Sequence, residues 1–167
     1  MPYQGEPIKD VTYRLILVLP GSRKILVLAT GDSDCLPSVQ IPQGTRVAKE
    51  VQNATRQLWE LDVIVLDFLP FEDADPPCAI AEVLCSKRLV GLVAVGIDQL
   101  MDIGLGETLS ARLASTFQGD ALSNRPFSRA GWIDQAIVWL ESETGKRLSS
   151  KVKSTNTTQL LNLHYCA

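Results

Sequence analysis

The sequence contains few of the residues that build metal centres and reactive pairs. Its 167 residues include one histidine, His164, and four cysteines, no two of which have CxxC spacing. A structural zinc site needs about four closely spaced cysteine or histidine ligands, so this pattern argues against one. A nucleophile activated by histidine would depend on His164, which stands in the tail of the sequence.

An excess of positive charge and a long apolar stretch are also missing. The formal net charge is -3 and the pI is about 5.2, whereas a general electrostatic binder of nucleic acid is basic. No apolar stretch is long enough to span a membrane, and no basic region followed by an apolar run indicates a signal peptide. We therefore expect no nucleic-acid or membrane partner, and a cytoplasmic protein with reduced, buried thiols.

The residues that are present suit a globular fold with a substantial core. Hydrophobic residues make up 46% and charged residues 21% of the sequence, which is a typical globular balance. Patterning predicts strands over residues 11–19, 25–30, 39–41, 63–69, 79–85 and 91–95, and a weak strand over 160–163. Helices are predicted over 46–61, 107–117 and 131–143. This order predicts an α/β (α+β) fold with hairpins.

The helix predicted over 46–61 has two distinct stripes. Its apolar residues recur at spacings of four, three, four and three, which places them on one helical face: Val47, Val51, Ala54, Leu58 and Leu61. A polar stripe lies beside it and contains Glu50, Asn53, Gln57 and Glu60.

Two motifs adjoin this helix and suggest a family. Residues 41–44 read Ile-Pro-Gln-Gly, and residues 56–61 read Arg-Gln-Leu-Trp-Glu-Leu. With the hairpin before them, the strand after them and residues 92–100, they make residues 8–118 resemble the Nudix family. The resemblance implies a mixed β-sheet packed between helices. It also implies helix carboxylates that hold Mg²⁺ on a diphosphate, where the metal neutralises charge and activates water.

The match to the family signature is degenerate. That signature is a glycine, a glutamate after five residues and, after seven more, Arg-Glu-apolar-any-Glu-Glu-any-Gly-apolar. Gly44 matches the first glycine and Glu50 the first glutamate, but Arg56 comes two residues early. Aligning the helix on Arg56 instead puts Ala48 at the first glutamate and Val63 at the late glycine.

On the Arg56 alignment, the three metal-binding glutamates fall on Gln57, Glu60 and Leu61, so two of three carboxylates are replaced. Glu50 and Glu60 would lie about 15 Å apart along a helix and could not chelate one ion. The resemblance therefore implies catalytic roles for Glu60, Glu50 and Arg56, with Glu60 as the metal ligand. Ordinary solvated helix residues are the alternative interpretation of both glutamates.

Further ligand-binding candidates are Gly44, Gln57, Arg23 and Glu72. Arg23 stands at the turn of the first hairpin, where it could meet a phosphate or simply be exposed. Glu72 belongs to an acidic, proline-bearing loop that follows a strand, and such loops often border binding clefts. A solvated loop is the favoured interpretation of this segment, and Glu72 is kept as a minor candidate.

A second, shorter resemblance concerns the C-terminal part of the chain. Residues 124–132 and the helix after them, with Trp132 and Trp139 seven residues apart, make residues 124–163 resemble the lead-in of aminoglycoside-phosphotransferase-like, kinase-like proteins. We expect a Nudix-like domain over 1–118, a linker over 119–130 and a helical extension over 131–167. Trp132 and Trp139 would contact the main domain, a second copy or a downstream domain.

Three functions remain open at this level. The first is a non-catalytic Nudix-like domain that binds a nucleotide or another phosphorylated metabolite in a regulatory role and requires no cofactor. The second is a divergent pyrophosphohydrolase that uses Mg²⁺ or Mn²⁺, held by Glu60, Glu72 and the Gly44 carbonyl. The third is a docking module for a downstream kinase-like domain. The sequence favours the first, and leaves the chain's status as an enzyme undecided.

Overall fold

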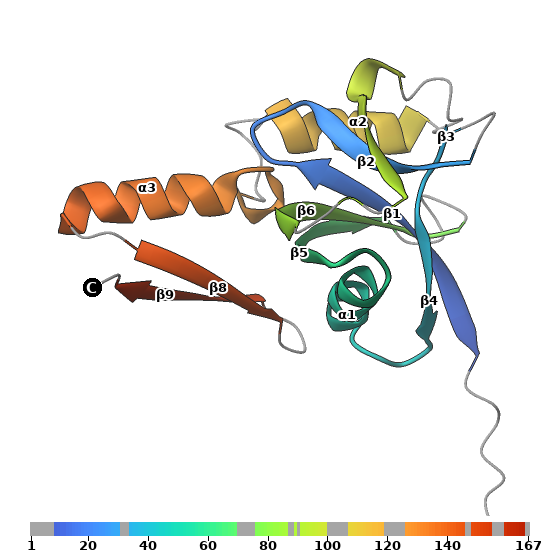
Figure 1. The fold of residues 1–167 in the computed structure, drawn as a ribbon, viewed down its shortest axis with the longest axis horizontal. Helices are drawn as coiled ribbons and strands as arrows, with labels where there is room; N and C mark the ends of the chain where they lie inside the picture. Colours follow the sequence, from blue (N-terminus) through green and yellow to red (C-terminus); the bar gives the residue numbers. More distant parts are fainter. Residues whose placement is uncertain are drawn as a thin grey trace, which may run out of the picture.

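The computed structural model shows one large mixed sheet with helices on both faces (Figure 1). It describes residues 9–30, 34–69, 76–86, 89, 91–99, 107–118, 126–145, 148–154 and 159–165. The large sheet consists of β1 (Asp10–Leu19), β2 (Lys24–Ala29), β3 (Asp34–Cys35), β4 (Ser38–Pro42), β5 (Leu61–Leu69), β6 (Cys78–Ser86) and β7 (Leu92–Gly96). The helices are α1 (Val47–Trp59), α2 (Glu107–Gln118) and α3 (Trp132–Thr144), and a separate hairpin comprises β8 (Leu148–Ser154) and β9 (Gln159–Tyr165).

Strand β1 organises the sheet. Its first half pairs antiparallel with β4, and its last three residues pair antiparallel with β2. Its opposite edge pairs in parallel with β6, which pairs antiparallel with β5. Strand β2 also pairs with β3 and β7. The sheet is therefore mixed, and β5 forms one of its edges.

Alternation along β1 builds a core on each face of the sheet. Leu15 and Leu17 belong to a cluster with Val51 and Trp59 of α1. Residues Ile16 and Val18 belong to the opposite cluster, which contains Leu113 of α2 and Ile133 of α3. Successive strand side chains point to opposite faces, so this run is apolar because both faces are covered. The predicted α/β (α+β) class, with a mixed β-sheet packed between helices, is confirmed.

The C-terminal part combines a helix with a hairpin. Helix α3 extends past the sheet, and the β8–β9 hairpin lies beside it (Figure 1). The extension predicted as helical over 131–167 therefore also contains two strands. Strand β9 includes the weak strand predicted over 160–163, whereas β8 was not predicted. The domain limits stay a prediction, and residues 119–125 of the proposed linker lie outside the described residues.

None of the helices in the described part of the chain has the length and apolarity that crossing a membrane requires.

Helix α1 differs from its prediction at its C-terminal end. The periodicity placed Leu58 and Leu61 on its buried face, but Leu58 is 58% exposed and Leu61 is the first residue of β5. Trp59 is buried instead, together with Val51 and Thr55. The cause is that residue 60 leaves the helix, so the covered face at this end is set by contact with β5 rather than by spacing alone.

Candidate functional site

The loop that leads into α1 is a tight turn. The backbone N–H and the hydroxyl of Thr45 both donate to the Pro42 carbonyl, at 3.2 and 2.7 Å. Gly44 has φ 82°, a left-handed conformation that glycine adopts without strain. Arg46 is the N-cap residue, and no side chain caps the helix there. Gly44 therefore lies at the N-terminal end of α1.

The other end of α1 is closed by a glutamate in an unusual conformation. Glu60 has φ 54° and is the one non-glycine residue with positive φ among the described residues. Its N–H donates to the Arg56 and Thr55 carbonyls, which ends the helix in a left-handed cap. Glycine usually fills this position, because a side chain there costs roughly 1–2 kcal/mol. Glu60 is thus a cap residue and not part of the predicted helical stripe.

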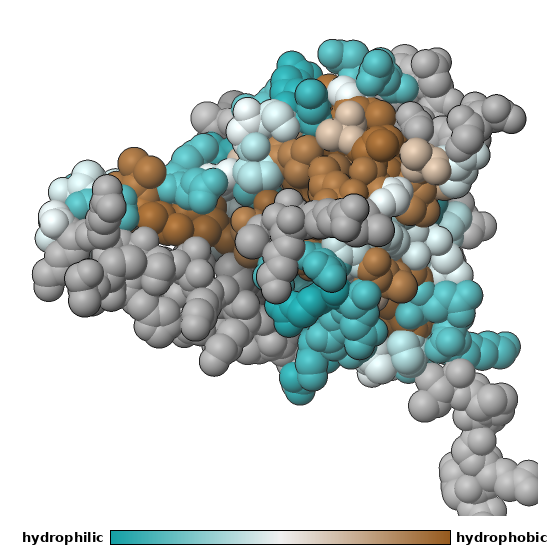
Figure 2. Space-filling view, in the orientation of Figure 1, coloured by the Kyte–Doolittle hydropathy of each residue, from teal (hydrophilic) through white to brown (hydrophobic). Residues whose placement is uncertain are grey.

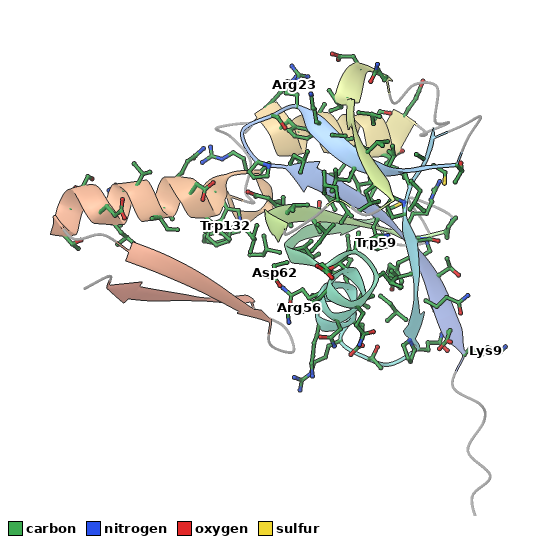
Figure 3. All side chains as sticks on the ribbon, viewed as in Figure 1. Lys9, Arg23, Arg56, Trp59, Asp62 and Trp132 are labelled. Atoms are coloured by element: carbon green, nitrogen blue, oxygen red, sulfur yellow. The ribbon has the colours of Figure 1, made fainter. Side chains whose placement is uncertain are left out.

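Directly after this cap, Asp62 forms an ion pair with Arg56 (Figure 3). Arg56 Nε and Nη2 both donate to the same oxygen, Asp62 Oδ1, at 2.8 and 2.6 Å. The side chains are 66% and 49% exposed, so solvent screens the pair. Within the described part of the chain, no other hydrogen bond engages Arg56 Nη1 or Asp62 Oδ2.

The contacts that hold α1 against β5 fix the position of this corner. Gln52 Nε2 donates to the Val63 carbonyl at 3.0 Å, and Trp59 packs in the core below. Gln57 and Glu60 are exposed on the outer side, next to Arg56. Figure 2 shows a hydrophilic surface over α1, as expected for the polar stripe. Arg56, Gln57 and Glu60 are therefore brought together at the C-terminal end of the helix.

The remaining candidate residues lie elsewhere. Gly44 is at the opposite end of α1, which spans about 20 Å. Glu50 is half-buried in the first turn of the helix. Arg23 is in the β1–β2 turn, far from Arg56 (Figure 3), and its carbonyl accepts a bond from the Ile97 N–H. Glu72 lies outside the described residues.

The donor set does not fit the magnesium site that the Nudix resemblance implies. At the C-terminal end of α1, Gln57 offers only a neutral amide oxygen, and Asp62 is engaged by Arg56. Glu50 is about 15 Å from Glu60 along the helix axis. The described residues contain no group of three or more His, Cys, Asp or Glu side chains placed to hold a metal ion. Among the described residues at this corner, Glu60 is therefore the one carboxylate that no ion pair engages.

Sequence reasoning missed two acidic residues with clear structural roles. Asp62 precedes the apolar run of β5, and nothing in the sequence pairs it with Arg56 across the helix end. Glu82 interrupts the apolar strand β6, and that lone charge was a usable signal. It is 1% exposed, and its Oε2 accepts a 2.8 Å bond from the Gly131 N–H at the start of α3. Burial raises the pKa of the Glu82 carboxyl, and the nearby Asp134 charge adds to the rise, whereas the Gly131 bond opposes it.

Of the thiols that the sequence predicts to be buried, the structure describes the side chains of two. Cys78 is fully buried and Cys35 is half-buried, and neither forms a disulfide. Burial raises the pKa of the Cys78 thiol, although the Arg14 guanidinium beside it acts in the opposite direction. A thiol with a raised pKa is a poor nucleophile at neutral pH, so Cys78 is a core residue.

The two C-terminal tryptophans have different environments. Trp132 packs against the core cluster that contains Ile133, and its ring meets that of Phe127 edge-on, with centroids 5.0 Å apart. Trp139 is 61% exposed, because α3 has by then passed the edge of the core. Contact with the main domain is thus made by Trp132. A partner at Trp139 stays a prediction.

Comparison with known proteins gives one kind of match. No family model matches the chain, and no curated protein matches it. Among solved structures, the chain is similar to the crystal structure of an ADP-ribose pyrophosphatase from Streptococcus suis. The two share 17% sequence identity at a TM-score of 0.46, and the match covers 69% of this chain and 93% of that one.

Proposed function

We propose that this chain is a Nudix-like domain that binds a nucleotide or another phosphorylated metabolite without hydrolysing it. The observation that carries the proposal is the side-chain set at the C-terminal end of α1. An exposed Arg56 and Gln57 stand there beside a single unshared carboxylate, Glu60. Cleavage of a diphosphate by a bound metal needs a site that holds the ion and orients water. The residues that the structure describes at this corner do not supply such a set.

The same residues suit recognition of an anion. A guanidinium presents planar donors that match a phosphate, and Gln57 can both donate and accept. Leu58 adds an apolar side chain, 58% exposed, next to these polar groups. A ligand that combines phosphate with an apolar or ring-bearing part can therefore contact charge and apolar surface at one corner of the molecule. A regulatory role would follow if ligand binding changed the behaviour of a longer protein.

The first test combines binding with turnover. The full chain is incubated with nucleoside triphosphates, nucleotide sugars, ADP-ribose and dinucleoside polyphosphates, with Mg²⁺, with Mn²⁺ and with EDTA. A ligand at a hundred times its Kd should raise the free energy of unfolding by about 2.7 kcal/mol, seen as a thermal shift. We expect at least one ligand to give this shift in EDTA, with no product formed under any condition.

Glu60→Gln separates binding from hydrolysis because the two functions predict opposite signs. If Arg56 binds an anion directly, removing the neighbouring negative charge should tighten binding by up to about fivefold. If Glu60 holds a catalytic metal, the same change should abolish turnover. Glu143→Gln, an exposed change of equal charge on α3, is the control for net charge. Turnover that disappears in Glu60→Gln but survives in Glu143→Gln would overturn the proposal.

A further inference from the structure

The Arg56–Asp62 contact uses only part of the bonding capacity of each side chain. In the strongest arginine–carboxylate pairs, two N–H groups meet two different oxygens in parallel. Here Nε and Nη2 converge on Oδ1 alone, at 2.8 and 2.6 Å. Both side chains are also largely in solvent, and exposed pairs of this kind contribute little to folding. The pair therefore contributes little to the stability of the fold.

The backbone is nevertheless shaped to make this contact. Glu60 takes the left-handed conformation, and the pairing of β5 with β6 shifts register between Asp62 and Val63. The extra residue at this shift is Leu84 of β6, because Asp62 pairs with Cys85 and Val63 with Val83. The left-handed cap at Glu60 is therefore what turns the chain through the corner at which Asp62 meets Arg56. Since β5 is an edge strand, the Asp62 side chain has solvent to move into when it leaves.

We propose that Asp62 is an internal competitor for the anion-binding donors of Arg56, which a phosphate group of the ligand displaces. This inference rests on the proposed function, because it concerns how the same corner binds its ligand. A phosphate offers Nε and Nη2 one oxygen each, which restores the parallel geometry that Asp62 does not provide. It also carries more negative charge than a carboxylate. Binding at this corner is therefore independent of divalent metal and is held back by the protein's own carboxylate.

Calorimetric titration of the full chain with inorganic pyrophosphate in EDTA tests the exchange. Asp62→Asn should bind about fivefold more tightly than wild type, which is the upper value for an exposed ion pair expressed as an affinity ratio. Arg56→Ala should bind at least tenfold more weakly, and Arg56→Ala/Asp62→Asn should behave like Arg56→Ala. Glu143→Gln, which changes the net charge as Asp62→Asn does, should bind like wild type. Both exchanged side chains are exposed, so thermal midpoints within about 4 °C of wild type should confirm that all variants fold.

The outcomes separate the two proposals. If wild type binds pyrophosphate and Arg56→Ala does not, but Asp62→Asn binds equally or more weakly than wild type, the competition is refuted and the binding function stands. Retained affinity in Arg56→Ala refutes the assignment of Arg56. If no variant binds pyrophosphate and no phosphorylated ligand shifts the thermal midpoint of wild type, the proposed function itself is wrong. If Glu143→Gln raises the affinity for pyrophosphate as much as Asp62→Asn does, net charge explains the change and the competition is refuted.

Discussion

Glu82 is the residue whose chemistry departs most from its surroundings. Its paired neighbours, Val18 on β1 and Ile64 on β5, are apolar. Its carboxylate accepts the Gly131 N–H at the beginning of α3, where the helix dipole favours negative charge. Burial outweighs these contacts and raises the pKa of the carboxyl. Glu82 thus links the sheet to the C-terminal helix at an electrostatic cost.

The raised pKa of Glu82 determines the direction in which the free energy of unfolding changes with pH. Between the ordinary pKa of 4.5 and the higher folded-state value, the folded chain binds more protons than the unfolded chain. The Glu82 contribution to the free energy of unfolding therefore falls as pH rises through this window. Glu82→Gln should remove that part of the slope, because an amide does not titrate. Its oxygen still accepts the Gly131 N–H, so the hydrogen bond is kept. Urea unfolding from pH 4.5 to 8, with Glu143→Gln as the exposed control, measures it.

Glu82→Ala tests the hydrogen bond separately from the charge. It leaves the Gly131 N–H without its carboxylate acceptor, which should lower the free energy of unfolding by about 1–3 kcal/mol. Equal stability of the Ala and Gln variants would show that the bond contributes nothing. A slope in Glu82→Gln identical to wild type would show that another group titrates.

At the scale of the element, α1 offers two adjacent residues with opposite environments. Leu58 is 58% exposed and Trp59 is 9% exposed. Leu58→Ala should change the free energy of unfolding by no more than about 0.5 kcal/mol, as surface changes do. Trp59→Ala should cost about 3–5 kcal/mol through lost burial and the cavity left behind. Chemical denaturation followed by circular dichroism compares them. A larger loss in Leu58→Ala would instead support the face given by the sequence periodicity.

The end of α1 also shows what sequence patterning can and cannot predict. The three helices and the strands of the large sheet other than β3 were predictable, because apolar runs and helical spacing report burial directly. The two-residue strand β3 lies in a stretch that the sequence predicted as a loop. Leu61 continued the helical spacing by coincidence and starts a strand instead. The corner depends on the cap at Glu60, which lacks the glycine that usually marks such a turn. The Arg56–Asp62 ion pair depends on the geometry of that corner, so the sequence alone could not predict it.

The candidate site residues also differ in how far the sequence alone could group them. Arg56, Gln57 and Glu60 are close in sequence and remain together in space, so a motif could find them. Gly44 and Arg23 were grouped with them by resemblance and by charge. The fold places Gly44 before the opposite end of α1, and Arg23 in the β1–β2 turn, far from Arg56 (Figure 3). Residues that are close in sequence stay close in the fold, so a motif can group them. Whether residues far apart in sequence meet depends on how the strands and helices are arranged.

At the scale of the whole molecule, the question is how firmly the C-terminal helix belongs to the domain. Ile133 is 2% exposed and packs into the cluster built by β1, β5, β6 and α2, whereas Val138, on the projecting part of α3, is 65% exposed. Figure 2 shows apolar surface continuing along α3 past the sheet.

If residues 126–133 complete the core, Ile133→Ala should lower the free energy of unfolding of the whole chain by about 2–5 kcal/mol in one cooperative transition. Val138→Ala, the matched change on the same helix, should stay within about 0.5 kcal/mol. Urea unfolding followed by both tryptophan fluorescence and circular dichroism distinguishes the cases. Two separate transitions, with Ile133→Ala affecting only the weaker one, would mean that α3 and the hairpin form a unit that docks on an already complete domain.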